Sequence, residues 1–172
     1  MEKHKRLGRT FYRTHADILA PALLGKLLCR SVGDTVRRAR ITETECYMGE
    51  DDTACHASRG RTARTDVLYR TGGTIYVYLC YGIHEMLNVV AGAEEFPEAV
   101  LIRGVEGVSG PGRVTKSLFI DRALNGGDLC ESDALWIEDD GYIPAYHTAP
   151  RVGIGYAAPA DRERHWRFIM DS

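Results

Sequence analysis

Short runs in which apolar and polar residues alternate fill most of the chain, and this period-two pattern predicts β-strands. Residues 27–32 and 36–47 form two such runs, and Gly33-Asp34 between them is typical of a hairpin turn. Further predicted strands cover residues 74–80, 84–90, 99–105, 134–138 and 151–156. Helical spacing is rarer, and it predicts helices over residues 15–24 and 113–120.

Strands that follow one another with few interposed helices favour an α+β fold. We expect a single domain over residues 1–172, built on a curved, mostly antiparallel β-sheet with peripheral helices. Residues 1–6 are expected to form a disordered arm; no apolar segment of a secretory signal follows this basic start. The apolar run over residues 18–28 is interrupted by Pro21, Gly25 and Lys26, so no membrane-spanning segment is predicted.

The predicted strand that ends at Tyr47 carries the candidate chemistry. Because side chains alternate along a strand, Glu43, Glu45 and Tyr47 share one face, and Ile41 is expected to be its apolar end. The acidic loop that follows ends at His56. A carboxylate beside an aromatic ring, with a histidine returning on the next loop, predicts a pocket for a flat, electron-poor ligand. The alternative is an ordinary solvated strand face.

Two later strands add aromatic and charged candidates. Tyr76 and Tyr78 lie on one face of the predicted strand 74–80, and Tyr81 follows it at a predicted surface tip. Arg103 interrupts the apolar strand 99–105, and a buried charge is costly unless it is paired. Glu106 follows closely in the sequence and is one candidate partner.

Two polar segments could contact an anion. Residues 57–66 mix arginines with small residues that leave backbone N–H groups accessible, which suits phosphate contact, although a solvated loop is an equally open interpretation. The glycine-containing loop 109–113 precedes a predicted helix and could hold an anion at its N-terminus. Its spacing fits neither a P-loop nor a dinucleotide fingerprint.

Composition narrows these possibilities. The 172 residues include 22 basic and 24 acidic ones, a net charge of −2, which opposes nucleic-acid binding through overall charge but permits a local basic face. The five cysteines are odd in number and contain no C-x-x-C pair, so we expect reduced thiols of a cytosolic protein. His56, Cys46 and Cys55 are close in sequence, but no fourth-ligand pattern accompanies them, and no metal is expected.

Several segments now resemble one family in order and spacing. They are ITETECYMGEDDTACH (41–56), YVYLCYGIHEMLN (76–88), AVLIR (99–103) and GPGRVTK (110–116), followed by RVGIG (151–155) and WRF (166–168). The first resembles the family pattern V-E-T-E-A-Y-x-G-x-x-D-x-A-x-H, and the second resembles Y-V-Y-x-x-Y-G-M-x-x-x-x-N. The chain is thereby identified as resembling the alkyladenine (3-methyladenine) DNA glycosylases over about residues 7 to 168.

The resemblance implies a DNA repair enzyme that flips a damaged purine out of the duplex and hydrolyses its N-glycosidic bond with water, leaving an abasic site. Glu45 would be the general base, and Arg103 would help to hold the attacking water. The remaining implied roles are stacking on the base by Tyr47, His56 and Tyr78, exclusion of guanine by Asn88, and insertion of Tyr81 into the duplex as a wedge.

The resemblance also implies how the protein meets DNA. Phosphate contacts are expected from Arg61, Thr62, Arg64, Arg113 and Lys116, with strongly salt-dependent binding. Arg113 stands where a lysine is commoner, and the segment after Arg103 is shorter than in many members of the family, so fewer backbone contacts are expected.

Further expectations concern substrates, partners and place. The implied substrates are 3-methyladenine, 7-methylguanine, hypoxanthine and ethenoadenine in double-stranded DNA. We expect an intracellular monomer without a cofactor and without a membrane contact. No lysine nucleophile is placed near Glu45, so no Schiff-base lyase step is expected. One alternative is a non-catalytic module on the same fold that binds damaged DNA or RNA, which an intact Glu45 and Arg103 disfavour. A nucleoside hydrolase is disfavoured by the wedge tyrosine and the basic loop.

Overall fold

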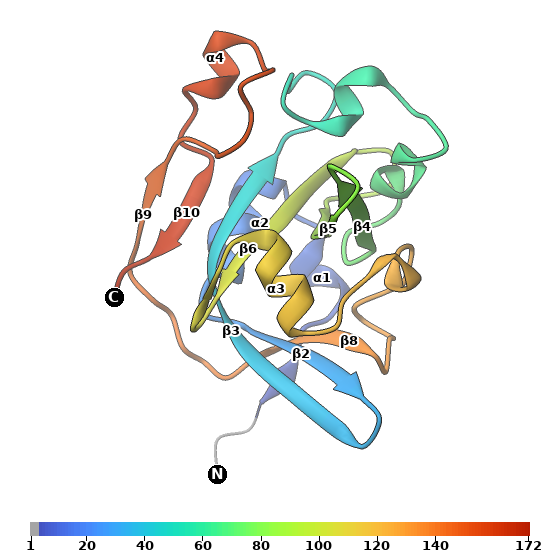
Figure 1. The fold of residues 1–172 in the computed structure, drawn as a ribbon, viewed down its shortest axis with the longest axis vertical. Coiled ribbons are helices and arrows are strands. Elements are labelled where there is room, and N and C mark those ends of the chain that lie inside the picture. The colour runs from blue at the N-terminus through green and yellow to red at the C-terminus, as the bar shows by residue number, and fades with distance from the viewer. Residues whose placement is uncertain (1–3) are drawn as a thin grey trace.

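A computed structural model describes residues 4–172 (Figure 1). The strands are β1 (Lys5–Arg6), β2 (Leu27–Val32), β3 (Thr35–Tyr47), β4 (Ile75–Cys80), β5 (His84–Ala91), β6 (Glu98–Val105), β7 (Val108–Ser109), β8 (Leu135–Asp139), β9 (Tyr146–Ala149) and β10 (Arg167–Met170). The α-helices are α1 (Arg9–Tyr12), α2 (Ala16–Leu23), α3 (Pro111–Ser117) and α4 (Pro159–Arg162). Short 3₁₀ helices cover His56–Arg59, Thr65–Tyr69 and Arg122–Leu124.

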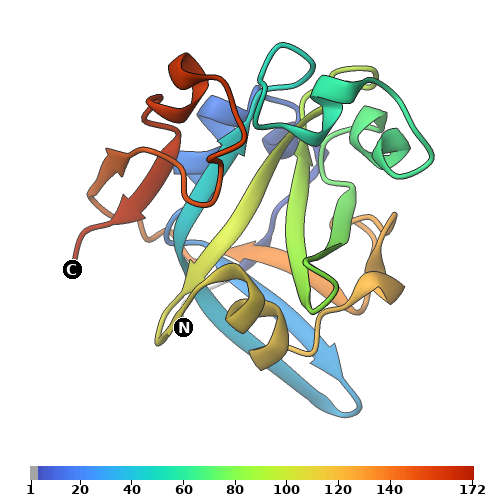
Figure 2. The same ribbon diagram turned by 45° about the horizontal axis from the view of Figure 1, so that its top comes forward.

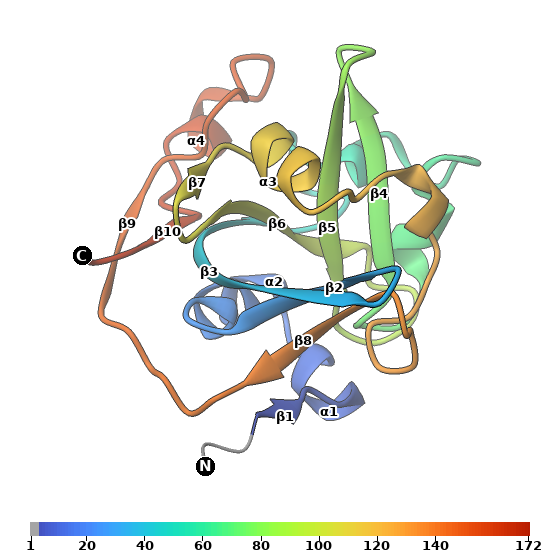
Figure 3. The ribbon, with the colours of Figure 1, turned by 60° about the horizontal axis from the view of Figure 1, so that its bottom comes forward.

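The strands form a sheet in the order β1-β8-β2-β3-β6-β5-β4, and every strand pairing described is antiparallel. This confirms the predicted α+β architecture with a curved antiparallel sheet, whose curvature Figure 2 displays. Helix α2 packs against β3, β5 and β6, and α3 packs against β5 and β6. In Figure 3, α2 lies below β6 and α3 above it. The main core contains the buried apolar side chains of α2 together with those that β3, β5 and β6 turn toward it.

Strand β3 is the long central element that positions the site. Its first half pairs with β2 through the predicted hairpin at residues 33–34, and its second half pairs with β6 on one edge and β10 on the other. The register shifts between Ile41 and Thr44, which interrupts the alternation of faces there. Ile41, which precedes this shift, is completely buried in the main core.

The predicted strand over residues 151–156 is also wrong. These residues form a loop between β9 and α4, and Gly153 has a φ of +74°, a left-handed conformation that a strand does not contain. The strands of this region are β9 and β10, which pair with each other and place β10 beside β3. The loop is then free to cross the end of β3, where Glu45 lies.

The expected disordered arm is corrected in part. Residues 1–3 lie outside the described residues, but Lys5–Arg6 form β1 and pair with β8. The Arg6 guanidinium donates hydrogen bonds to the carbonyl oxygens of Leu129 and Ser132, and it lies 5.5 Å from the centre of the Trp136 ring. These contacts order the chain from β1 onward.

The turn between β4 and β5 confirms the predicted tip. Cys80 pairs with His84, so residues 81–83 form a three-residue loop, in which Tyr81 and Gly82 have left-handed φ values of +52° and +70°. The side chain of Tyr81 is 88% exposed. Strand β6 turns directly into β7, since Val105 pairs with Val108. In the described part of the chain, no helix has the length and apolar character needed to cross a membrane.

Candidate active site

Glu45 is a completely buried carboxylate whose oxygens are held from both sides. The Tyr47 hydroxyl donates a hydrogen bond to Oε1 at 2.9 Å, and the backbone N–H of Val152 donates to Oε2 at 2.8 Å. Burial raises the pKa of Glu45, while the Val152 N–H, the Arg103 charge and the Tyr47 hydroxyl oppose that rise. A carboxylate that keeps two donors in a buried place is suited to accept a proton from a bound water.

Arg103 lies between two carboxylates of β3. Its Nε is 3.2 Å from Oε1 of Glu43 and 3.8 Å from Oε2 of Glu45. Glu106, the partner considered from the sequence, is instead exposed in the turn between β6 and β7. Arg103 pairs with Glu43 and not with Glu106 because β3 and β6 pair directly. This pairing brings Glu43 opposite the stretch of β6 that carries Arg103.

Glu43 has a second cationic partner. The Nη1 of Arg167, on β10, donates a hydrogen bond to Oε1 of Glu43 at 3.2 Å. Arg103 and Arg167 thus share the Glu43 carboxylate, and Arg103 lies closer to Glu43 than to Glu45. Glu43, Glu45 and Tyr47 project to the same side of β3, as the strand pattern predicted.

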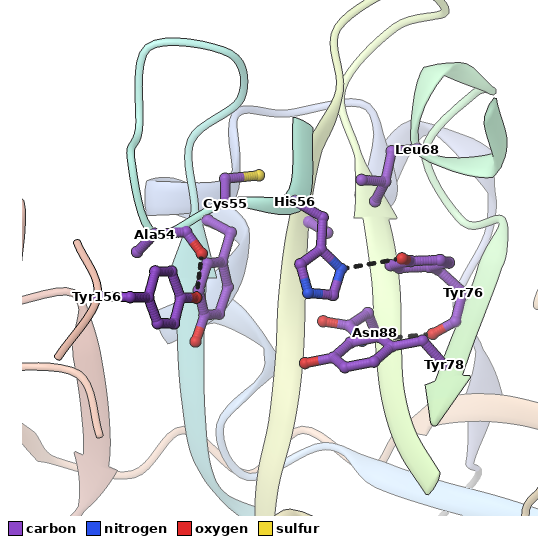
Figure 4. A pocket seen from close by; sticks show the side chains of 10 residues that line it. Ala54, Cys55, His56, Leu68, Tyr76, Tyr78, Asn88 and Tyr156 are labelled. Carbon is purple, nitrogen blue, oxygen red and sulfur yellow. Dashed lines mark hydrogen bonds between the residues drawn. The ribbon is translucent and has the colours of Figure 1, made fainter. Parts of the chain in front are cut away.

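A small aromatic pocket opens beside Tyr47. Its lining residues are Tyr47, Ala54, Cys55, His56, Leu68, Tyr76, Tyr78, Asn88, Ala99 and Tyr156. Figure 4 shows His56, Tyr76, Tyr78 and Asn88 on one side, with Ala54 and Tyr156 facing them. The pocket joins a wider cleft of about 660 Å³, which also borders Tyr81, Thr62, Arg64 and Arg103.

His56 is a neutral aromatic wall of the pocket. Burial lowers its pKa to about 4, with the charges of Arg64 and Arg59 acting in the same direction. Its Nδ1 is 3.0 Å from the Tyr76 hydroxyl, and its ring centre is 4.4 Å from that of Tyr78 in an edge-to-face contact. His56 and Tyr78 thus contact each other on the same side of the pocket.

Asn88 lies on β5, opposite Tyr76 of β4 and Leu101 of β6. It is only 4% exposed, and its Nδ2 donates long hydrogen bonds of 3.4 Å to the carbonyl oxygens of Tyr76 and Met86. The side chain thus reaches the pocket from the sheet and is oriented by two backbone groups.

Of the residues expected to contact phosphates, two border the cleft and three lie away from it. Thr62 and Arg64 border the cleft, where the Arg64 guanidinium lies 5.1 Å from the centre of the Tyr78 ring. Arg61 does not border it and is paired with Asp66 and Glu95, at 2.8 Å each. Arg113 and Lys116 are exposed on α3, which packs against β5 close to the Tyr81 turn, where the Thr115 hydroxyl donates a hydrogen bond to the Glu85 carbonyl oxygen.

Three contributors were missed by sequence reasoning. Tyr76 could have been found, because it shares a strand face with Tyr78. The Val152 N–H could not, because a backbone group leaves no sequence signal. Tyr156 was assigned to a core strand, yet it is 67% exposed and borders both the pocket and the cleft.

A buried ion pair between Arg151 and Asp52 connects the two loops that carry site residues. The side chain of Arg151 is fully buried and binds both carboxylate oxygens of Asp52, at 2.6 and 2.9 Å. Its guanidinium also lies 4.9 Å from the ring centres of Tyr47 and Trp166. The pair joins the loop that carries Val152 to the loop that carries His56.

No metal site accompanies these residues. Within residues 4–172, no group of three His, Cys, Asp or Glu side chains is arranged to hold an ion. Cys46 and Cys55 are buried, and burial raises the pKa of the Cys55 thiol to about 11.

Comparison with known proteins gives a consistent result. A family model described as methylpurine-DNA glycosylase (MPG) matches residues 10–110 and 106–172. A protein of Psychrobacter cryohalolentis is 44% identical over 173 residues, covering 83% of this chain and 82% of its own length. Proteins of Methanocella arvoryzae and Rickettsia felis are each 40% identical, covering 94% and 99% of this chain and 90% and 96% of their own. All three bear the name "Putative 3-methyladenine DNA glycosylase".

The chain belongs to the methylpurine-DNA glycosylase family, and it is a DNA glycosylase, an enzyme of DNA repair. The resemblance found in the sequence is confirmed over the length of the chain.

Proposed function

We propose that this DNA glycosylase removes alkylated and deaminated purines from double-stranded DNA. The substrates are 3-methyladenine, which the names of the relatives indicate, and 7-methylguanine, hypoxanthine and ethenoadenine, which suit the same flat aromatic pocket. The observation that carries the proposal is the buried Glu45 carboxylate, which accepts hydrogen bonds from the Tyr47 hydroxyl and the Val152 N–H, two residues that line the cleft. An idle binding module has no need of such a costly buried acid.

Glu45 acts as the general base. A water beside it loses a proton to the carboxylate while its oxygen attacks C1′ of the flipped nucleotide. The bond between C1′ and the purine nitrogen breaks, and its electron pair leaves with the base. A base alkylated at a ring nitrogen carries a positive charge and departs neutral, so it needs no proton donor. Arg103 holds the water against Glu45.

The protein extracts the base through its aromatic groups. Tyr81, exposed on its hairpin tip, enters the duplex and fills the space that the flipped nucleotide vacates. Tyr47, His56 and Tyr78 stack on the base, and Asn88 disfavours guanine by crowding its exocyclic amine. Neutral His56 avoids repelling a cationic purine.

The DNA backbone is held by a local basic face composed of Arg61, Thr62, Arg64, Arg113 and Lys116. The enzyme works as a monomer inside the cell, where its duplex substrate lies. Its product is an intact abasic strand, because the mechanism uses water in place of a lysine nucleophile.

The test is base release from duplex oligonucleotides that each contain one lesion. Incubation under single-turnover conditions should produce abasic sites at the lesion, with strand cleavage only after alkaline treatment. Cleavage without alkali would contradict the monofunctional mechanism. Tight duplex binding without base release, for every lesion and at every pH, would instead support the non-catalytic module.

A further inference from the structure

Tyr156 occupies an unusual place for a large aromatic residue. It lies in the loop between β9 and α4, and its side chain is 67% exposed, yet it borders both the pocket and the cleft. Figure 4 shows its ring reaching toward the pocket from the side opposite Tyr78. The ring is therefore not part of the core, and its surface is available to whatever fills the pocket.

The ring is held in place although it is not buried. The Tyr156 hydroxyl donates a hydrogen bond to the carbonyl oxygen of Ala54 at 2.8 Å. The loop around it is also fixed, since Ile154 and Ala157 pack with Ala54 in a small buried cluster. An aromatic side chain that is pre-oriented loses little conformational entropy when a ligand stacks on it.

Tyr156 differs from the neighbouring tyrosines in having no positively charged side chain of the described residues over its ring. Tyr47, Tyr78 and Tyr156 line both the pocket and the cleft. The Arg151 guanidinium lies 4.9 Å from the ring centre of Tyr47, and the Arg64 guanidinium lies 5.1 Å from that of Tyr78. Among residues 4–172, no guanidinium or ammonium group lies over Tyr156.

These differences matter for a charged ligand. The negative face of an aromatic ring attracts a cation, and a ring already facing an arginine offers less attraction to a second positive charge. A purine alkylated at a ring nitrogen is cationic in DNA, whereas hypoxanthine is neutral. Of the three tyrosines that line both the pocket and the cleft, Tyr156 therefore offers a cationic base the ring face that no arginine from residue 4 onward already occupies.

We propose that Tyr156 is a specificity-determining residue, whose ring packs against the flipped nucleotide and favours positively charged purines over neutral ones. This inference rests on the proposed base-releasing function. Tyr47 and Tyr78 should distinguish cationic from neutral purines less strongly than Tyr156 does. The competing view is that Tyr156 merely ties its loop to Ala54.

The experiment compares single-turnover excision of 7-methylguanine and hypoxanthine by Tyr156→Phe and Tyr156→Leu. Leucine keeps apolar bulk but has no π face, whereas phenylalanine keeps the face and loses only the hydroxyl. An exposed cation–π contact corresponds to a factor of about two to five. We expect the 7-methylguanine to hypoxanthine rate ratio to fall by that factor in Tyr156→Leu and to stay at the wild-type value in Tyr156→Phe.

Tyr142 provides the matched control. It is 45% exposed, lies outside the residues that line the pocket and cleft, and faces the guanidinium of Arg40. Tyr142→Leu should leave the rate ratio unchanged. Thermal unfolding of every variant checks that the fold is retained, and the spontaneous loss of 7-methylguanine is subtracted.

The outcomes separate the two proposals. Two outcomes would overturn the specificity role and favour fixation of the loop through the hydroxyl. In one, both rates fall equally in Tyr156→Leu. In the other, the 7-methylguanine to hypoxanthine rate ratio falls in Tyr156→Phe as much as in Tyr156→Leu. If the wild-type protein releases neither base, the proposed function itself fails. The ratio of dissociation constants for the two lesion duplexes, measured in a Glu45→Gln background, then decides the role of Tyr156 without turnover.

Discussion

The base pocket has two walls of different construction. The strand wall consists of Tyr76, Tyr78 and Asn88, which paired strands β4 and β5 hold in a fixed register. The loop wall consists of Ala54 and Tyr156, which the segments after β3 and β9 supply. The first wall is held by the sheet ladder, whereas the second depends on side-chain bonds. The strand wall should therefore tolerate side-chain substitution, whereas the loop wall should depend on a few buried contacts.

Glu45 is the proposed general base, so removing its charge should have the largest effect on activity. Glu45→Gln keeps the shape of the side chain but cannot accept the proton of the attacking water. We expect the single-turnover rate of base release to fall by a factor of about 10² to 10⁴, the usual contribution of a general base. Duplex binding should change little, and retention of the wild-type rate would remove Glu45 from the mechanism.

Breaking the support of the loop wall should have the largest effect on stability. Arg151→Met leaves Asp52 buried without its partner, and such a loss costs about 3 to 5 kcal/mol in the free energy of unfolding. Arg164, which is 50% exposed and pairs with Asp161, is the matched control, and Arg164→Met should cost less than about 1 kcal/mol. Urea denaturation measures both. Equal losses would show that the buried pair does not fix the loop.

His56 connects the loop wall to the strand wall, and its burial predicts a dependence of stability on pH. Its pKa is lowered to about 4 in the folded state, whereas an unfolded histidine titrates near 6.5. Between these values the unfolded chain binds a proton that the folded chain refuses, so stability falls as pH decreases through this window.

Replacing His56 by Gln should flatten part of that slope. The measurement is the free energy of unfolding of wild type and His56→Gln at intervals from pH 7.5 to 4, values chosen to bracket roughly the two pKa values. Parallel curves would mean that His56 is accessible to protons in the folded state.

Substitution of the arginines near the cleft should have a smaller effect, which is a change in the salt dependence of DNA binding. Arg64 borders the cleft, whereas Arg61 is already paired with Asp66 and Glu95. Each phosphate contact contributes about 0.9 to the slope of log Kd against log salt concentration. Arg64→Gln should reduce that slope by nearly this amount and Arg61→Gln by less. An equal reduction would show that DNA displaces the acidic partners of Arg61.

The strand wall could be predicted from sequence, and the loop wall could not. Period-two alternation placed Tyr76 and Tyr78 on one face and marked the Tyr81 turn, because strand geometry is local. The same reasoning failed at residues 151–156, whose apolar alternation imitates a strand although Gly153 has a left-handed backbone conformation. Long-range contacts decide that region, and the buried bond from Arg151 to Asp52 joins residues far apart in the chain.

Charge pairing shows a similar limit. Arg103 was recognised as a buried charge in need of a partner, but its partner comes from a neighbouring strand, where register decides which side chains meet. The catalytic strand could thus be located from sequence, while the immediate surroundings of Glu45 required the fold.

The central claim is that a buried, ionised Glu45 activates water, and the pH dependence of 7-methylguanine release tests it most directly. This cationic base needs no proton to depart, so the acid side of the profile reports the ionisation of the base catalyst alone. Burial raises the pKa of Glu45, and the rate should therefore fall as pH decreases through a value above that of an ordinary glutamate. A rate that stays constant down to about pH 4, below the ordinary glutamate pKa, would contradict the account.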